Sequence, residues 1–121
     1  MKNNQKTAKL GEDLACQYLI RKKYQILGRN IKYREGEIDI IAQKDKQLIF
    51  IEVKTRTNFR FGYGEQSFDL RKRQKLEKAI LKYIYQHNYQ GAWRVDLITI
   101  EINNKKAWLR HYLSQELGHE Y

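Results

Sequence analysis

Apolar residues near the beginning of the chain recur at the spacing of a helix. Leu10, Leu14 and Leu19 fall four to five positions apart, with mostly polar residues between them. Residues at such spacing share one face of a helix, so the pattern predicts a helix over residues 7–23. A second apolar face of the same kind predicts a longer helix over residues 67–87.

The stretches between and after these helices are short and rich in β-branched and aromatic residues, and turn residues bound them, as is typical of strands. The predicted strands span residues 26–33, 37–42, 48–55, 94–102 and 105–113, with a loop over residues 57–66. The second helix allows the fourth strand to join parallel to a neighbour. The order αβββαββ therefore predicts an α/β fold with a central mixed β-sheet flanked by helices.

The size and composition of the chain are those of one domain. Its 121 residues can bury a core without metal or disulfide staples. We expect a single domain over residues 1–121, with flexible polar ends at residues 1–6 and 114–121. Cys16 is the only cysteine, which excludes an internal disulfide and suggests a small core residue. No apolar run is long enough to span a membrane, and we expect a cytoplasmic protein.

Three charged residues lie on the predicted hairpin at residues 37–55. If its turn is centred on Asp45 and Lys46, Asp39 lies opposite Glu52, and opposed residues have Cβ atoms about 4.5 to 5.5 Å apart. Lys54 follows Glu52 by two positions and so shares its face. The alternate face is apolar and can pack on a helix; it carries Ile38, Ile40, Ile49, Ile51 and Val53.

This arrangement suits metal-dependent hydrolysis of a phosphodiester. Asp39 and Glu52 could share a Mg²⁺ or Mn²⁺ ion, which would lower the pKa of a bound water, while Lys54 orients that water or stabilises the transition state. A purely structural role for these residues stays open, because a chain of this composition contains roughly one or two acidic-x-Lys matches by chance. Glu52 and Lys54 would then be a solvent-facing edge, with Asp39 bridged to a neighbouring cation.

A strong positive charge indicates a polyanionic partner. The chain has 24 Lys plus Arg against 14 Asp plus Glu, a net charge of +10. Neutralising phosphates releases counterions, so nucleic acid is the expected partner. The same charge would also suit an anionic membrane surface or simple solubility, although we expect no membrane association.

Further basic residues extend this expectation. Arg56 and Arg60 lead into a loop with aromatic residues that could hold phosphate and stack unpaired bases, or could pack on the core. The second helix carries a basic stripe that could follow DNA or be merely solvated. Its members are Arg71, Lys75, Lys78 and Lys82.

Other polar residues have mixed interpretations. Glu37 shares the face of Asp39 and could be a further ligand, although a residue beside a turn is more often solvated. Asp96 is either a structural acid paired with Arg94 or a support for the site. The three histidines have no metal-ligand spacing and receive no catalytic role.

The segments GEIDIIA and IFIEVKTR together resemble the PD-(D/E)xK nuclease superfamily and, more narrowly, the YraN-like bacterial proteins. The resemblance extends from Gly11 to the strand containing Asp96 and implies a restriction-endonuclease-like three-layer fold. It also implies Asp39 and Glu52 as metal ligands and Lys54 as the catalytic lysine. Ile38 replaces the usual proline before the first acid.

Similarity to archaeal Holliday-junction resolvases adds Glu12, which matches a catalytic glutamate of the first helix. Lys72, in the first turn of the second helix, matches the pattern of the YraN-like proteins and could approach the site. The resemblance implies an endonuclease for branched or structured DNA that leaves a 5′-phosphate, for which a homodimer would be suitable. A non-catalytic nucleic-acid-binding module and a basic protein-interaction domain are the alternatives.

Overall fold

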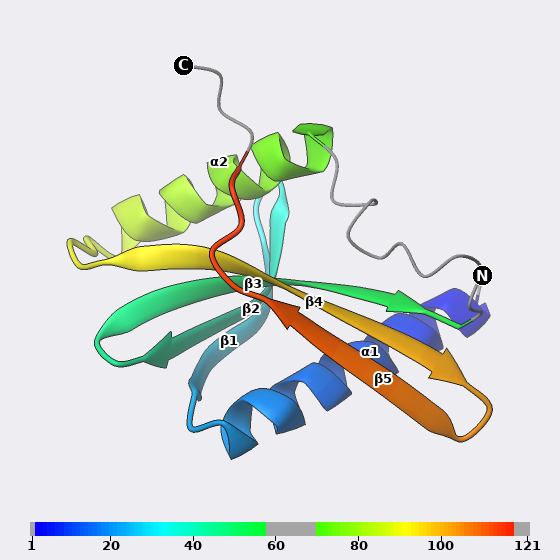
Figure 1. Cartoon of the computed structure of the whole chain (residues 1–121). Coiled ribbons are helices and arrows are strands. Elements are labelled where there is room, and N and C mark those ends of the chain that lie inside the picture. Colours follow the sequence, from blue (N-terminus) through cyan, green and yellow to red (C-terminus); the bar gives the residue numbers. More distant parts are fainter. Residues whose placement is uncertain (1, 58–69, 118–121) are drawn as a thin grey trace.

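The structure, a computed structural model, describes residues 2–57 and 70–117. It contains the predicted elements in the predicted order (Figure 1). They are α1 (Lys2–Arg21), β1 (Gln25–Lys32), β2 (Glu37–Lys44), β3 (Gln47–Arg56), α2 (Leu70–Gln86), β4 (Trp93–Asn103) and β5 (Lys106–Tyr112). The predicted α/β fold is confirmed.

The five strands form one mixed sheet in the order β1-β2-β3-β4-β5. Neighbouring strands are antiparallel except β3 and β4, which are parallel. Helix α2 lies between these two strands in sequence and supplies the crossover that a parallel pair requires. The sequence predicted this connection correctly.

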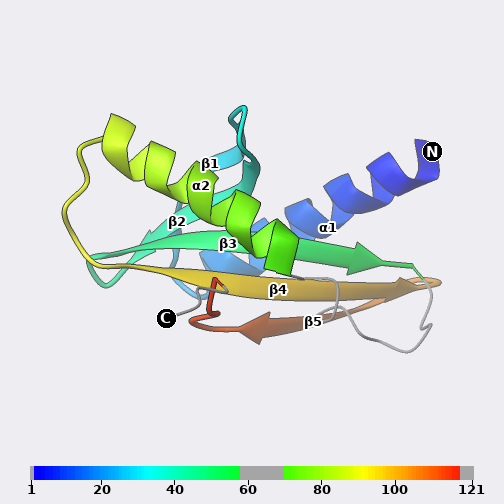
Figure 2. The same cartoon turned by 90° about the horizontal axis from the view of Figure 1, so that it is seen from above.

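The helices cover opposite faces of the sheet and make three layers (Figure 2). Ile40, Ile49 and Ile51 pack in one core with α1, whereas Phe50 packs in the other with α2. The middle of β3 is therefore buried on both faces, which explains its unbroken apolar run from Leu48 to Ile51. Cys16 is buried in the α1 core, as expected.

A two-residue turn sets the register of the β2–β3 hairpin. Asp45 and Lys46 have φ angles of 52° and 63°, the left-handed pair that fits the twist of a tight hairpin. The strands then pair in the predicted register, from Lys44 opposite Gln47 to Ile40 opposite Ile51.

Backbone pairing between β2 and β3 ends at Ile40 and Ile51, although both strands continue. Ile38 lies in the α2 core and not with Ile40 in the α1 core, so the prediction that they share a face is wrong. The physical reason is that β2 leaves β3 here, which interrupts the alternation of faces. The strands make a fork at Asp39.

The ends of some elements differ from the prediction. Helix α1 begins at Lys2, among polar residues that carry no apolar period. After β5 the chain folds back, and Leu117 is buried in the α2 core. Residues 58–66 of the predicted loop, and the predicted start of the second helix at 67–69, lie outside the described residues. Neither α1 nor α2 has the length and apolar character of a bilayer-crossing helix.

Candidate active site

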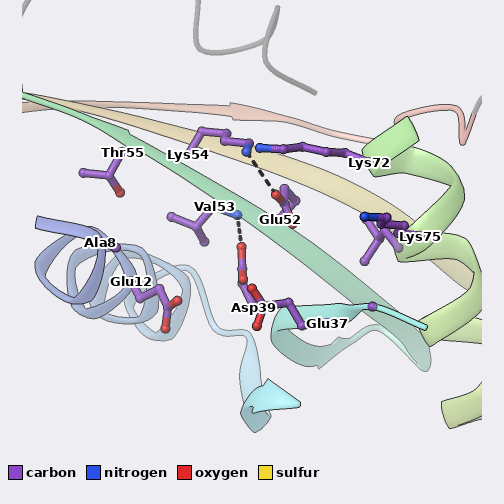
Figure 3. Close-up of a pocket in the computed structure, with 12 residues that line it drawn as sticks. Ala8, Glu12, Glu37, Asp39, Glu52, Val53, Lys54, Thr55, Lys72 and Lys75 are labelled. Atoms are coloured by element: carbon purple, nitrogen blue, oxygen red, sulfur yellow. Dashed lines mark hydrogen bonds and ion pairs between the residues drawn. The ribbon is translucent and has the colours of Figure 1, made fainter. Parts of the chain in front are cut away.

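A cavity of about 500 Å³ lies at the fork between β2 and β3. Both helices and both strands contribute to its walls (Figure 3). Asp39, Glu52 and Lys54, the three residues selected from the hairpin, all line it. The structure therefore brings the predicted constellation together in one accessible place.

Asp39 is fixed by the backbone of the opposite strand. Its Oδ2 accepts a hydrogen bond of 2.8 Å from the Val53 N–H. Backbone pairing between β2 and β3 has ended at this point, so the Val53 N–H has no carbonyl partner on β2. The Asp39 carboxylate accepts the hydrogen bond in place of that carbonyl. Asp39 consequently reaches the cavity from β2 beside Glu52 on β3.

Glu52 and Lys54 form an ion pair along β3. Their Oε2 and Nζ atoms are 3.5 Å apart, and the side chains are only 15% and 16% exposed. Lys72 extends from α2 toward Lys54 (Figure 3). Four acidic residues and three lysines line the cavity: Glu12, Glu37, Asp39, Glu52, Lys54, Lys72 and Lys75. The Glu52 and Lys54 side chains are largely shielded from solvent, so the interaction between them is stronger than in water.

Both carboxyl groups are harder to ionise than usual. Burial, together with the charge of Glu52, raises the pKa of Asp39 to about 8, although the Val53 hydrogen bond opposes this shift. Burial also raises the pKa of Glu52, against the opposing charge of Lys54. A positive ion between the two carboxyl groups would lower both pKa values and stabilise the ionised forms.

The pKa of the Lys54 amine is shifted in the opposite direction, below its usual value. Burial lowers its pKa, its hydrogen bond with Lys72 lowers it further, and Glu52 counteracts both. A lowered lysine pKa is found at many catalytic amines, although ion-pair networks also cause such shifts.

Glu12 reaches the cavity because α1 approaches β3 very closely. A Cβ atom at Gly11 would collide with the side chain of Thr55, so only glycine permits this contact. Glu12 also lies 3.5 Å from the Arg29 guanidinium of β1. Sequence reasoning gave no role to Gly11, Thr55 or Arg29 in placing Glu12, because these contacts join separate elements.

The first turns of α2 supply the basic side of the cavity. Lys72 and Lys75 line it, and the Lys75 carbonyl oxygen lies so close to Gly36 that no Cβ fits there. Arg71 is exposed on the same helix, and Arg56 lies at the end of β3. Arg60 lies outside the described residues. Their roles with nucleic acid stay predictions.

Asp96 belongs to a separate network on the α1 side of the sheet. The fully buried carboxylate accepts hydrogen bonds from Arg94 Nε at 2.9 Å and from the Ser114 N–H at 3.0 Å, and lies 2.8 Å from His111 Nε2. Burial alone would raise the pKa of Asp96, but its partners, His111 foremost, hold it below the usual value. The predicted pairing of Asp96 with Arg94 is confirmed.

The donor atoms at the fork fit a hard divalent cation. Asp39 and Glu52 are the residues that could hold it, since carboxylate oxygens suit Mg²⁺ and Mn²⁺. Within residues 2–57 and 70–117, no group of three or more His, Cys, Asp or Glu side chains forms a ready-made metal site. Mg²⁺ commonly keeps several waters and takes further ligands from a phosphate, so two carboxylates could be sufficient to hold it.

Comparison with known proteins identifies close relatives. The model of the family described as "Uncharacterised protein family UPF0102" matches residues 11–100, which include the residues that line the cavity except Ala8. A UPF0102 protein of Caldanaerobacter subterraneus subsp. tengcongensis is 43% identical over 110 residues, 89% of this chain and 90% of the relative. One from Fusobacterium nucleatum subsp. nucleatum is 43% identical over 109 residues, 88% and 91% of the two chains. One from Carboxydothermus hydrogenoformans is 40% identical over 111 residues, 91% and 94%.

Proposed function

The chain belongs to the uncharacterised protein family UPF0102, and we propose that it is a divalent-metal-dependent endonuclease that hydrolyses phosphodiester bonds in branched or structured DNA. The observation that carries the proposal is the convergence of Asp39, Glu52 and Lys54 at the fork. Burial raises the pKa of both carboxyl groups, and a cation between them would favour their ionised forms, which supports a metal-binding role over a purely structural one.

Each residue has a distinct task in such a site. Asp39 and Glu52 would hold a Mg²⁺ or Mn²⁺ ion, which when bound neutralises phosphate charge and makes water a better nucleophile. Lys54 donates a hydrogen bond to the attacking water or to a phosphate oxygen. Lys72 and Lys75 attract the phosphates on either side of the reacting one.

The architecture agrees with the nuclease superfamily that the sequence resembles. The chain has a mixed sheet between two helices, with an acid and an acidic-x-Lys motif on one hairpin, and these features support the resemblance to the PD-(D/E)xK superfamily. Preference for branched DNA is proposed from the similarity to Holliday-junction resolvases, and the place of Glu12 in the cavity supports it. A homodimer would present two such sites to the two strands of a junction.

Cleavage of defined DNA substrates tests this function. Labelled single-stranded, duplex, flap and four-way substrates are incubated with Mg²⁺, Mn²⁺ or EDTA. We expect cutting of the branched substrates only with a divalent ion, leaving 5′-phosphates, and a loss of at least about a hundredfold for Glu52→Ala and Lys54→Ala.

Matched controls are the exposed residues Glu116 and Lys32. Glu116→Ala and Lys32→Ala should cut like the unchanged protein. Metal-independent cutting, or equal cutting by Glu52→Ala, would overturn the proposal. Salt-dependent DNA binding without cutting would instead indicate a non-catalytic binding module, and absence of binding a protein-interaction domain.

A further inference from the structure

Two lysines occupy backbone positions that favour glycine. Lys23 follows the last turn of α1 with a φ angle of 73°, and Lys46 is the second residue of the β2–β3 turn with a φ angle of 63°. A residue with a Cβ atom is strained in this left-handed region, whereas glycine is not. The other described non-glycine residues at positive φ have short polar side chains that tolerate it better: Asn30, Asp45, Asn88, Asn104 and Ser114.

The geometry of each turn requires the positive φ angle. The Lys23 N–H donates a hydrogen bond of 3.0 Å to the Ile20 carbonyl. The Tyr24 N–H donates one of 2.9 Å to the Leu19 carbonyl, and the two bonds together form the Schellman ending of a helix. Lys46 completes a two-residue hairpin turn, in which glycine is the favoured second residue. The local fold therefore gives no reason for lysine at either position.

The two turns meet on the side of the molecule away from the N-terminus (Figure 1). Lys44 joins them, because its Nζ donates a hydrogen bond of 2.9 Å to the Lys22 carbonyl. The same Nζ lies 4.6 Å from the centroid of the Tyr24 ring. Four exposed basic side chains surround this contact, and we call them the turn surface: Arg21, Lys22, Lys23 and Lys46.

The turn surface has the chemistry of a phosphate-binding surface. Within the described part of the chain, no ion pair joins any of its four cations to a carboxylate, and Asp45 is the one acid of the two turns. Gln25 and Gln43, opposite each other on β1 and β2, add exposed amide donors. Tyr24, the one aromatic residue among residues 20–25 and 43–47, is only 8% exposed and cannot stack on an unpaired base. These groups suit the phosphates of a duplex, which are bound by charge and hydrogen bonds.

The turn surface lies about 20 Å from the candidate active site along the backbone, because Glu52 follows Lys46 by six residues and a strand rises about 3.3 Å per residue. About six base pairs of duplex span the same length, at roughly 3.4 Å each. A DNA arm that extends from the cavity can therefore bring its phosphates to the turn surface.

We propose that the turn surface binds the phosphates of a duplex arm of the DNA that is cut in the cavity. The inference rests on the proposed nuclease function for the identity of the polymer, and it names the duplex about six base pairs from the cut as the part bound. Lys23 and Lys46 contact phosphates from their strained positions, and Arg21 and Lys22 add charge beside them. An anionic membrane fits less well, because Ile20 is the one exposed apolar residue of the two turns and offers little surface for insertion.

Glycine substitutions in the full chain separate DNA binding from folding. Affinity for labelled four-way DNA is measured by fluorescence anisotropy in EDTA, where no cutting is expected. Lys23→Gly and Lys46→Gly should each weaken binding by about three- to tenfold, and the double variant should reduce the slope of log affinity against log salt by about two. The melting temperature of each variant should stay the same or rise by about 2–5 °C, because glycine relieves the strain.

Matched variants separate charge from backbone effects. Lys23→Arg and Lys46→Arg keep the charge and should bind DNA like the unaltered protein. Asn104→Gly changes another exposed turn residue at positive φ, and Lys32→Ala removes an exposed lysine of β1. Both should leave the DNA affinity unchanged. Sedimentation with vesicles that contain phosphatidylserine measures membrane binding by the same variants.

Failure of this inference and failure of the nuclease assignment give different results. Unchanged DNA affinity of the double glycine variant, or an equal loss in the arginine variants, would overturn the inference even if metal-dependent cutting is observed. A lower melting temperature of the glycine variants would also overturn it, since the fold itself would then need the lysines. Loss of vesicle binding without loss of DNA binding would identify a membrane as the partner instead. A loss of DNA binding confined to the glycine variants would support the inference even if no substrate is cut, because binding is measured without metal.

Discussion

The carboxylate of Asp39 accepts a hydrogen bond from the backbone N–H of Val53 across the point where β2 and β3 separate, at 2.8 Å. The bond holds one acid beside another on the adjacent strand, in a place where neither is well solvated. Two carboxyl groups of raised pKa therefore lie side by side, and the proposal that they bind a cation has several measurable consequences.

Replacing Asp39 by asparagine should stabilise the metal-free protein at pH 9. The amide oxygen can still accept the Val53 bond, while the buried charge beside Glu52 is removed. We expect the free energy of unfolding in urea with EDTA to rise by about 1–3 kcal/mol. Glu116→Gln, an exposed control, should change it little. A destabilised Asp39→Asn would mean that the ionised acid is already compensated within the protein.

The stabilising effect of Mg²⁺ should depend on pH. The folded pKa of Asp39, about 8, lies above its unfolded value, so between about pH 4 and 8 the folded state binds the extra proton. This group's contribution to metal-free stability therefore falls as pH rises through that window. A cation must displace the proton, so the increase in melting temperature with Mg²⁺ should grow from pH 6 to about 8 and then level off. An increase independent of pH would exclude Asp39 as the titrating ligand.

Alanine at Gly11 should destabilise the fold and disturb Glu12 together. The new methyl group would collide with Thr55, so α1 must move away from β3. A cost of about 1–3 kcal/mol is expected in urea unfolding. Gly28→Ala is a suitable control, because its Cβ would meet only a flexible Ile31 methyl, at 3.2 Å. Partial recovery in Gly11→Ala with Thr55→Ala would identify the collision as the cause.

Removal of Asp96 should affect stability and not the active site. Asp96→Ala would leave Arg94 and His111 without their buried partner, at a cost of about 3–5 kcal/mol. Binding of Mg²⁺ below the lowered melting temperature should be unchanged, since Asp96 lies on the other face of the sheet. Weakened metal binding in the folded variant would show that this network supports the site after all.

Local sequence patterns were sufficient to predict the order of the elements and the register of the β2–β3 hairpin. The register follows from the turn at Asp45 and Lys46, and a parallel fourth strand follows from the helix between it and the third. The fork could not be predicted, since alternation along β2 gives no sign that pairing stops at Ile40.

The shape of the candidate site depends on contacts between distant elements, which a single sequence does not reveal. Glu12 reaches the cavity through the approach of Gly11 to Thr55, and a sequence pattern cannot distinguish this glycine from a poor helix residue.

Direct measurement of metal binding tests the central claim, that Asp39 and Glu52 together hold a divalent cation. Isothermal titration of the protein with Mn²⁺ at pH 8 should show one ion per chain. Asp39→Asn and Glu52→Gln should each abolish this binding, while Glu116→Gln retains it. Unchanged binding by Asp39→Asn and Glu52→Gln, or no Mn²⁺ binding by the unaltered protein, would contradict the account.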